Sequence, residues 1–293
     1  MKARTLLIAI LLLLHIGPLQ AQLKVMTYNI LTGFDWNQDS TRGTELIKWV
    51  NTHKPDVLAL QEMNGFNPER LAVFAKKWGH DHSAIVKSSG YPVALTSNKP
   101  IIVKERLLEG MWHGMLHCET QGIDFFVVHL SPADWQFRKR EALLISEKIK
   151  VVAKETNDYI VLGDFNAHSP SDSEFSRKYP YQLERYRKGD ASNDKYQNLH
   201  NREYDYSVLS TFLSLSLIDV SNRFVPMNDR TTCPTPLNVP RWLSTEEMKK
   251  TKHRIDFILL SPKLAQKCTG AWIYNGQENY YLSDHYPVMV ELK

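Results

Sequence analysis

The sequence is poor in cysteine, has no long apolar run in its body and carries little net charge, and each scarcity excludes a class of protein. Its cysteines are Cys118, Cys233 and Cys268, too few for a disulfide framework, although one pair could bridge in an oxidising compartment. Their spacing matches no metal-ligand motif, which argues against structural zinc. Beyond the N-terminus no stretch approaches the ~20 apolar residues that span a bilayer, so we predict no transmembrane segment in the mature chain.

The N-terminus reads as an export signal over residues 1–21. Two basic residues precede an apolar core over residues 6–14, and a polar break leads to Ala21, the expected cleavage point. The core is too short to span a bilayer comfortably, so an uncleaved anchor is the weaker alternative. We therefore predict a secreted or periplasmic protein whose mature part covers residues 22–293.

The charge of the mature part is close to neutral. Removing the signal takes away two basic residues and no acid, so the net charge falls from +4 to +2. This balance does not indicate the strong basic face of a dedicated duplex-DNA binder, although it does not exclude DNA binding. The remaining length suits one large domain with a sizeable core, and no repeat or low-complexity linker divides it. We expect no obligate protein partner.

Apolar runs and helical periodicity alternate along the chain. Apolar runs predict strands over residues 25–31, 57–60, 83–86, 93–96, 101–103, 123–129, 160–162, 254–260 and 288–292. Apolar residues at helical spacing predict helices over residues 44–50, 70–78, 136–153 and 205–215. This alternation with many strands indicates an α/β protein with mixed sheets.

Residues 169–205 read as an insertion. They carry seven basic and seven acidic side chains, so their charges cancel and form no cationic stripe along a phosphate backbone. Six aromatic residues argue against disorder. Since a loop this long is usually functional or disordered, two interpretations stay open: a solvated surface excursion, or an aromatic-rich lid beside the site.

Polar groups follow short apolar strands at six places. The clearest is Gly163-Asp164-Phe165-Asn166-Ala167, where a carboxylate and an amide two residues apart at a strand end can face the same side. Alone this pattern could be an Asx turn. Loops at strand ends are where α/β sheets build sites, so we expect the six segments to converge. The other five carry Asn29, Glu62, His129, Asp256 and the pair Asp284-His285.

The order and local sequence of these segments resemble the endonuclease/exonuclease/phosphatase superfamily, which contains pancreatic-type DNases, exonuclease III-like enzymes and inositol-polyphosphate 5-phosphatases. The resemblance runs from about residue 23 to residue 292. It implies a DNase-like α/β fold, a four-layer α/β sandwich of two mixed β-sheets flanked by helices. It also implies a divalent metal and in-line attack of water on a phosphoester.

The resemblance implies roles for the acids and for one histidine. Glu62 and Asp284 match metal ligands. Magnesium is the expected cation, with manganese or calcium as alternatives, because hard cations prefer oxygen ligands. Asp164 matches the acid that positions or deprotonates the attacking water. His285 matches the histidine of a His–Asp pair with Asp256, and its action as a base or as a phosphate ligand stays open.

The resemblance also covers two asparagines and a second histidine. Asn166 matches the residue that holds the phosphate, and Asn29 matches one that supports phosphate and metal, with a purely structural amide as its alternative. His129 matches the histidine that approaches the phosphate or the leaving group in DNase-like and phosphatase-like branches. The exonuclease III-like branch typically has tyrosine there, so His129 argues against an abasic-site repair enzyme.

The sequence thus predicts an exported, metal-dependent phosphoester hydrolase, foremost a phosphodiesterase or nuclease, whose partner is a phosphoester substrate such as a nucleic acid. A phosphatase or diesterase for small phosphorylated molecules or lipid headgroups is the alternative. A non-catalytic binding module on the same fold is a remote one, because it would be expected to lose catalytic residues. No substrate signature is recognisable in the chain.

Overall fold

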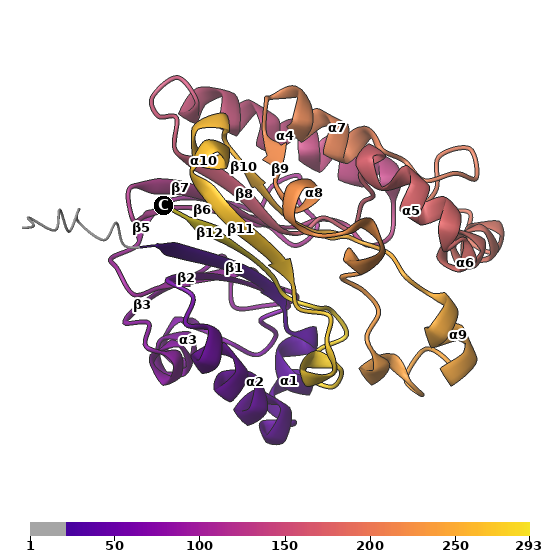
Figure 1. Cartoon of the computed structure of the whole chain (residues 1–293), viewed down its shortest axis with the longest axis horizontal. Helices are drawn as coiled ribbons and strands as arrows, with labels where there is room; N and C mark the ends of the chain where they lie inside the picture. The colour runs from indigo at the N-terminus through magenta and orange to yellow at the C-terminus, as the bar shows by residue number, and fades with distance from the viewer. Residues whose placement is uncertain (1–21) are drawn as a thin grey trace, which may run out of the picture.

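The protein folds as two β-sheets packed face to face between layers of helices (Figure 1). The computed structural model describes residues 22–293, so the predicted signal peptide lies outside the described residues. Helices α2 (Ser40–His53) and α3 (Pro68–Ala75) cover one outer face, and α4 (Trp135–Val152) and α7 (Ser207–Ser214) cover the other (Figure 1). The predicted four-layer α/β sandwich is therefore confirmed.

The first sheet has the strand order β11-β12-β1-β2-β4-β3. Its strands are β1 (Leu23–Asn29), β2 (Val57–Gln61), β3 (His82–Ile85), β4 (Ala94–Ser97), β11 (Cys268–Ile273) and β12 (Val288–Leu292). β1 and β2 run parallel with Asn29 opposite Gln61, so Asn29 and Glu62 leave the sheet at the same edge. β4 is antiparallel to β2, so the loop between β3 and β4 returns to that edge.

The second sheet has the order β5-β6-β7-β8-β10-β9. Its strands are β5 (Ile102–Leu107), β6 (Met115–Thr120), β7 (Ile123–His129), β8 (Tyr159–Asp164), β9 (Ile218–Asp219) and β10 (Asp256–Leu260). β7 and β8 are parallel with His129 opposite Asp164. β10 is antiparallel to β8 with Asp256 opposite Asp164, so three predicted site residues share one row.

Apolar clusters hold the layers together. Between the sheets, inward side chains such as Val25, Leu162 and Ile258 are fully buried. Ile145 of α4 packs with Phe126 of the second sheet, and Leu46 of α2 packs in the cluster under the first sheet. Because each strand alternates its side chains between two faces, both faces of each sheet are covered.

Shorter helices occupy the connections. They are α1 (Leu31–Asn37), α5 (Ser173–Lys178), α6 (Tyr181–Ala191), α8 (Ser221–Phe224), α9 (Thr245–Lys250), α10 (Pro262–Lys267), η1 (Lys76–Trp78), η2 (Pro170–Asp172), η3 (Met227–Asp229), η4 (Pro236–Asn238) and η5 (Gln277–Asn279). Residues 169–205, predicted as a long loop, thus contain η2, α5 and α6. No helix among residues 22–293 is long and apolar enough to cross a membrane.

The structure corrects several predicted boundaries. The strand predicted over residues 25–31 ends at Asn29, because the chain enters a left-handed turn at Leu31, where φ is 54°. Asp256, predicted inside a strand, is the first residue of β10. Strands β6 and β11 were not predicted, because polar residues interrupt their apolar runs. All three cysteines are free, so the optional disulfide does not form in the structure.

Candidate active site

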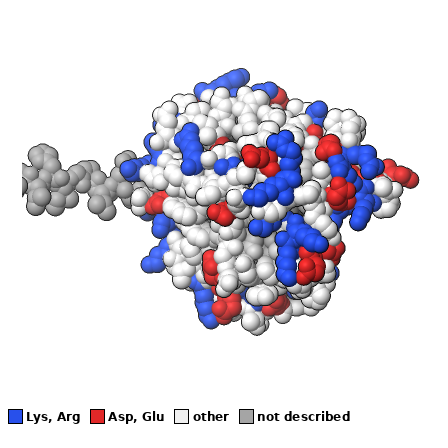
Figure 2. Space-filling model, turned by 45° about the vertical axis from the view of Figure 1, so that its right-hand side comes forward, with Lys and Arg blue, Asp and Glu red and all other residues white. Residues whose placement is uncertain are grey.

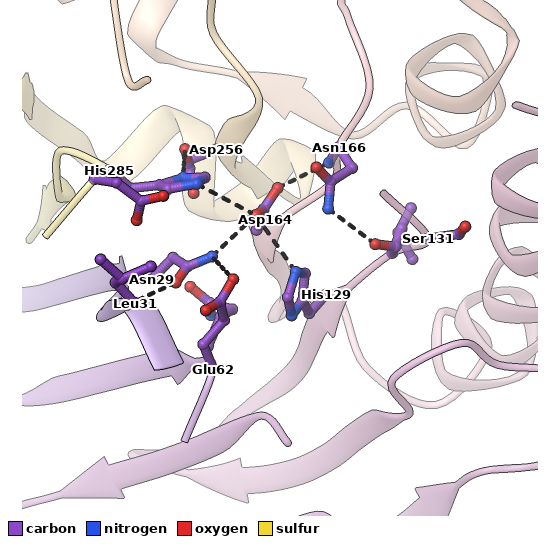
Figure 3. Close-up of polar contacts among 12 residues, drawn as sticks. Asn29, Leu31, Glu62, His129, Ser131, Asp164, Asn166, Asp256 and His285 are labelled. Carbon is purple, nitrogen blue, oxygen red and sulfur yellow. Dashed lines mark hydrogen bonds and ion pairs between the residues drawn. The ribbon is translucent and has the colours of Figure 1, made fainter. Parts of the chain in front are cut away.

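Two rows of polar side chains, one from each sheet, meet at a common edge (Figure 3). The second sheet contributes His129, Asp164 and Asp256 in register. From the first sheet, the Nδ2 of Asn29 donates to the Oδ2 of Asp164 at 3.1 Å and to the Oε1 of Glu62 at 3.3 Å. Asn29 therefore joins the two sheets, and residues far apart in the sequence converge as predicted.

The glycine before Asp164 is required by the sheet. Gly163 has a φ of +140°, and a Cβ atom there would lie 2.0 Å from the carbonyl oxygen of Val128 on the neighbouring strand. Only glycine allows this approach without moving the strand. The close packing at Gly163 fixes the position from which the Asp164 side chain leaves β8.

Asp164 lies at the centre of the contacts. Its Oδ1 accepts the backbone N–H of Asn166 at 2.8 Å. Its Oδ2 lies 3.5 Å from the Nε2 of His129 and 3.8 Å from the Nε2 of His285. Burial, and then repulsion from Asp256, raises the pKa of Asp164 to about 7. A carboxylate with such a pKa can accept a proton near neutral pH.

His285 and Asp256 form the predicted His–Asp pair. The Nδ1 of His285 lies 2.9 Å from the Oδ2 of Asp256, so the other ring nitrogen faces Asp164. Burial opposes a charge on the ring, but the surrounding carboxylates, led by Asp256, hold the pKa of His285 well above its usual value. In this state His285 is an imidazolium that can donate to an anion from Nε2.

Glu62 and Asp284 form an acidic pair beside this group. The Oε2 of Glu62 accepts the backbone N–H of Thr32 at 2.7 Å. Burial, followed by repulsion from Asp284, raises the pKa of Glu62. The loop that carries Asp284 is tied to β1, because the Oγ of Ser283 donates to the carbonyl oxygen of Asn29 at 2.6 Å. Within residues 22–293 no lysine or arginine forms an ion pair with Glu62 or Asp284.

The donor set fits a hard divalent cation. Partly buried carboxylates that repel one another without a cationic side chain are the environment in which oxygen-preferring cations bind. Asp164, Asp256 and His285 also offer ligand atoms within 4.8 Å of one another. Two groups could therefore hold a cation: Glu62 with Asp284, or that trio, in which His285 and Asp256 already satisfy each other by a hydrogen bond.

Asn166 is held in an uncommon conformation. Its φ is 47°, in the left-handed region, and Glu62 has a φ of 58°. The Nδ2 of Asn166 donates to the carbonyl oxygen of Leu130 at 3.0 Å, which leaves one amide hydrogen for a ligand. Strained backbone at two of the predicted site residues is typical of functional positions.

Two residues near the site were missed from the sequence. The ring of His113 stacks on that of His129, with centroids 4.2 Å apart. The Oγ1 of Thr232 accepts the backbone N–H of Asp256 at 3.2 Å and so positions that acid. His113 precedes β6, and a prediction of that strand would have placed it at the correct edge. Thr232 lies in a long loop and carries no sequence signal.

The insertion over residues 169–205 packs against the flank of the site. His168, next to it, stacks on Tyr204 with ring centroids 3.8 Å apart, and Tyr186 is set edge-on to both rings. The guanidinium of Arg138 donates to the carbonyl oxygen of Asn198 at 2.9 Å. These contacts tie the insertion to His168, in the chain that follows Asn166, and to α4.

Comparison with known proteins gives a match by sequence. A sequence model of the Endonuclease/Exonuclease/phosphatase family matches residues 26–285, which is most of the described chain. A search of curated proteins gives no match.

Solved structures share the fold. An AP endonuclease from Archaeoglobus fulgidus has a TM-score of 0.65 and 18% identity, over 92% of this chain and 99% of its own. The 3′ phosphatase NExo from Neisseria, bound to a product DNA hairpin, has a TM-score of 0.67 and 18% identity, over 92% of this chain and 99% of its own. The 3′-5′ exonuclease NExo from Neisseria meningitidis has a TM-score of 0.67 and 17% identity, over 92% of this chain and 100% of its own. At these identities the likeness establishes the fold.

Proposed function

Because the chain belongs to the endonuclease/exonuclease/phosphatase family, we propose that it is a metal-dependent phosphoester hydrolase and, within that class, an exported phosphodiesterase that acts on nucleic acid. The observation that carries the proposal is the contact network around Asp164, which joins groups from both sheets. It combines a proton acceptor, a cationic donor and an acidic pair in one place. These are the parts that attack on a phosphoester requires.

The side chains divide the chemistry between them. Asp164, with its pKa raised to about 7, orients a water and takes its proton as the water oxygen attacks phosphorus. His285, held as an imidazolium by Asp256, donates from Nε2 to a phosphoryl oxygen. Asn166 offers its remaining amide hydrogen to the same group. No covalent intermediate on the protein is required.

His129 has a different role from His285. Burial, and then the nearby His113, lowers the pKa of His129 well below its usual value, so its ring is neutral. A neutral ring contacts the phosphate or the leaving group without adding charge. This assigns the charged histidine to the phosphoryl oxygens and the neutral one to the flank of the substrate.

A magnesium ion would be held by Glu62 and Asp284, and when bound it would supply positive charge to the phosphoryl oxygens. Manganese or calcium would satisfy the same oxygen ligands. Asn29 supports this arrangement, because its amide donates to both Glu62 and Asp164 and keeps the two carboxylates at fixed positions.

Two lines support export and a nucleic-acid substrate. The predicted signal over residues 1–21 favours an exported protein. An AP endonuclease and a DNA-bound 3′ phosphatase share the fold, which makes nucleic acid a reasonable first substrate. On the face shown in Figure 2, basic and acidic side chains are interspersed, so the surface there has no broad basic area for a duplex.

A substrate panel tests the proposal. The purified mature protein is incubated with magnesium and with plasmid DNA, single-stranded RNA, bis-p-nitrophenyl phosphate or p-nitrophenyl phosphate. We expect hydrolysis of the diesters, its loss with a chelator, and a loss of at least ~100-fold in His285→Ala. Turnover of the monoester alone would select a phosphatase instead. Binding without turnover of any substrate would select the non-catalytic module and contradict the proposal.

A further inference from the structure

A row of aromatic rings leads from the candidate site to the surface. The ring centroids of His129 and His113 are 4.2 Å apart, those of His113 and Tyr91 are 5.3 Å apart, and those of Tyr91 and Trp36 are 6.5 Å apart. Exposure rises along the row, from 3% at His129 and 6% at His113 to 38% at Tyr91 and 52% at Trp36. The inner end touches Asp164, because the Nε2 of His129 lies 3.5 Å from its Oδ2.

The rings come from three separate segments of the chain. Trp36 lies in α1, Tyr91 in the loop between β3 and β4, and His113 just before β6. All three segments lie at the sheet edge where Asn29 and Glu62 end their strands. The turn that carries the outer ring is anchored, because Asp35, next to Trp36, accepts two hydrogen bonds from Arg241, at 3.1 and 2.8 Å. An exposed indole on an anchored turn is a preformed stacking surface.

A lysine without a carboxylate partner accompanies the row. Lys87 lies in the same β3–β4 loop as Tyr91, and its Nζ lies 4.0 Å from the position a Cβ atom would take at the adjacent Gly90. Its charge also lowers the pKa of His113 and of His129. Within residues 22–293 Lys87 forms no ion pair, and burial lowers its own pKa. A partly desolvated cation with no partner beside stacked aromatic rings suits an anionic ligand that also has flat rings.

We propose that the exposed rings of Trp36 and Tyr91, with the buried His113 packed behind Tyr91, form a subsite that stacks the bases of a single-stranded nucleic acid. The phosphodiester of this nucleic acid lies at Asp164, and Lys87 contacts a neighbouring phosphate. The subsite rests on the proposed function and names its substrate class. Aromatic rings with basic side chains along a groove bind single strands without sequence preference, since every base has a flat face. In a duplex the bases are stacked on one another and cannot enter such a row. A lipid headgroup offers no ring to stack.

Binding without turnover tests the subsite separately from the chemistry. Fluorescence anisotropy in the presence of EDTA compares a 5′-labelled thymidine octamer with an octamer of the same length that carries abasic sugars. The wild-type protein should bind the thymidine octamer at least ~5-fold more tightly, as expected when one base stacks on an aromatic ring. Equal affinity for both octamers, no binding of either, or equally tight binding of a matching duplex would overturn the subsite.

Variants assign the binding to the row. Trp36→Ala should weaken binding of the thymidine octamer at least ~5-fold and change binding of the abasic one by less than ~2-fold, while Trp36→Phe should restore most of the loss. Trp272→Ala removes an indole that is 38% exposed on the distant edge strand β11 and should change neither. Lys87→Gln should weaken both octamers alike and reduce the salt dependence. A Trp36→Ala protein with unchanged affinities would refute the assignment.

The same variants separate failure of the subsite from failure of the proposed function. Trp272→Ala should hydrolyse bis-p-nitrophenyl phosphate at the wild-type rate, and because this substrate carries no nucleobase, its hydrolysis reports the chemistry rather than the subsite. Absence of hydrolysis by the wild-type protein would count against the proposed function alone. Normal hydrolysis with no preference for bases would count against the subsite alone.

Discussion

At the scale of single residues, the site depends on where charge is placed. Asp256 holds His285 as an imidazolium, while burial beside His113 keeps the ring of His129 neutral. Two histidines that contact the same carboxylate, Asp164, therefore differ in charge because only one of them has an acid on its second nitrogen. The His–Asp pair was predictable from the motifs. The charge state of His129 was not, because it depends on packing.

The His–Asp pair makes a testable prediction. Asp256→Asn removes the negative charge that favours the imidazolium, so the pKa of His285 should fall and hydrolysis should slow by at least ~10-fold. An NMR titration of the metal-free protein measures the pKa, and diester turnover measures the rate. As a control, Asp124→Asn breaks an Asp–His contact of 2.6 Å with His117 at the far end of the strands and should leave the rate unchanged. The same pKa of His285 in Asp256→Asn and in the wild type would contradict the assigned pairing.

Glu141 gives a prediction on stability. Its buried carboxylate accepts the backbone N–H groups of Trp112 and Ser131, each at 2.8 Å, and burial raises its pKa to about 7. The unfolded chain loses this proton near pH 4.5, so between about pH 4.5 and 7 the folded state binds more protons. Through Glu141, the free energy of unfolding should fall by ~2–3 kcal/mol as pH rises across this window.

Glu141→Gln should remove that slope. Urea unfolding of both proteins at several pH values isolates the contribution, because every other titrating group is common to the pair. The unfolding free energy of the wild type minus that of Glu141→Gln should fall as pH rises from about 4.5 to 7, because only the wild type loses this contribution. A difference that stays constant with pH would show that Glu141 does not titrate in this range.

At the scale of elements, the turn α1 is the most unusual part of the fold. Every residue from Leu31 to Asn37 has a φ between 46° and 68°, a left-handed turn that costs L-residues ~1–2 kcal/mol each. The guanidinium of Arg42 offsets part of this cost by donating to the carbonyl oxygens of Ile30, at 2.6 Å, and Leu31, at 3.0 Å. The turn matters for the site, since it carries Trp36.

Gly33 makes the turn possible and gives its test. Its φ is +56°, and a Cβ atom there would lie 2.1 Å from the carbonyl oxygen of Asn64. Gly33→Ala should therefore lower the free energy of unfolding by ~2–4 kcal/mol. Gly189→Ala is the matched control, because nothing lies within 4 Å of its Cβ position and alanine favours its helix. Equal melting temperatures for Gly33→Ala and Gly189→Ala would contradict the close approach at Gly33.

Helices and strands were predictable where their apolar residues follow a clear strand or helix period. Strand β7 has the predicted bounds, and α4 differs by one residue at each end, since both carry an uninterrupted apolar pattern. In strand β6 the apolar pair Met115-Leu116 is followed by His117, Glu119 and Thr120, so its apolar run is too short to indicate a strand. Without that strand the edge position of His113 could not be inferred. Nothing in the sequence around Gly33 indicates seven consecutive left-handed residues, because tertiary contacts impose them.

At the scale of the whole molecule, the site exists only where two sheets meet. Asn29 and Glu62 come from one sheet, and His129, Asp164 and Asp256 come from the other. The apolar cluster between the sheets fixes the separation of the two rows, so the geometry of the candidate site is a property of the packed sandwich. The order of the motifs in the sequence could predict that convergence. It could not predict which atoms touch.

The most direct test is the rate of bis-p-nitrophenyl phosphate hydrolysis by magnesium-loaded Asp164→Asn relative to the wild type. The substitution keeps the size of the side chain at the centre of the network but removes its ability to accept a proton from water. We predict a rate at least ~100-fold lower, with a thermal midpoint within a few degrees of wild type. A rate close to that of the wild type would contradict the assignment of Asp164, and with it the site.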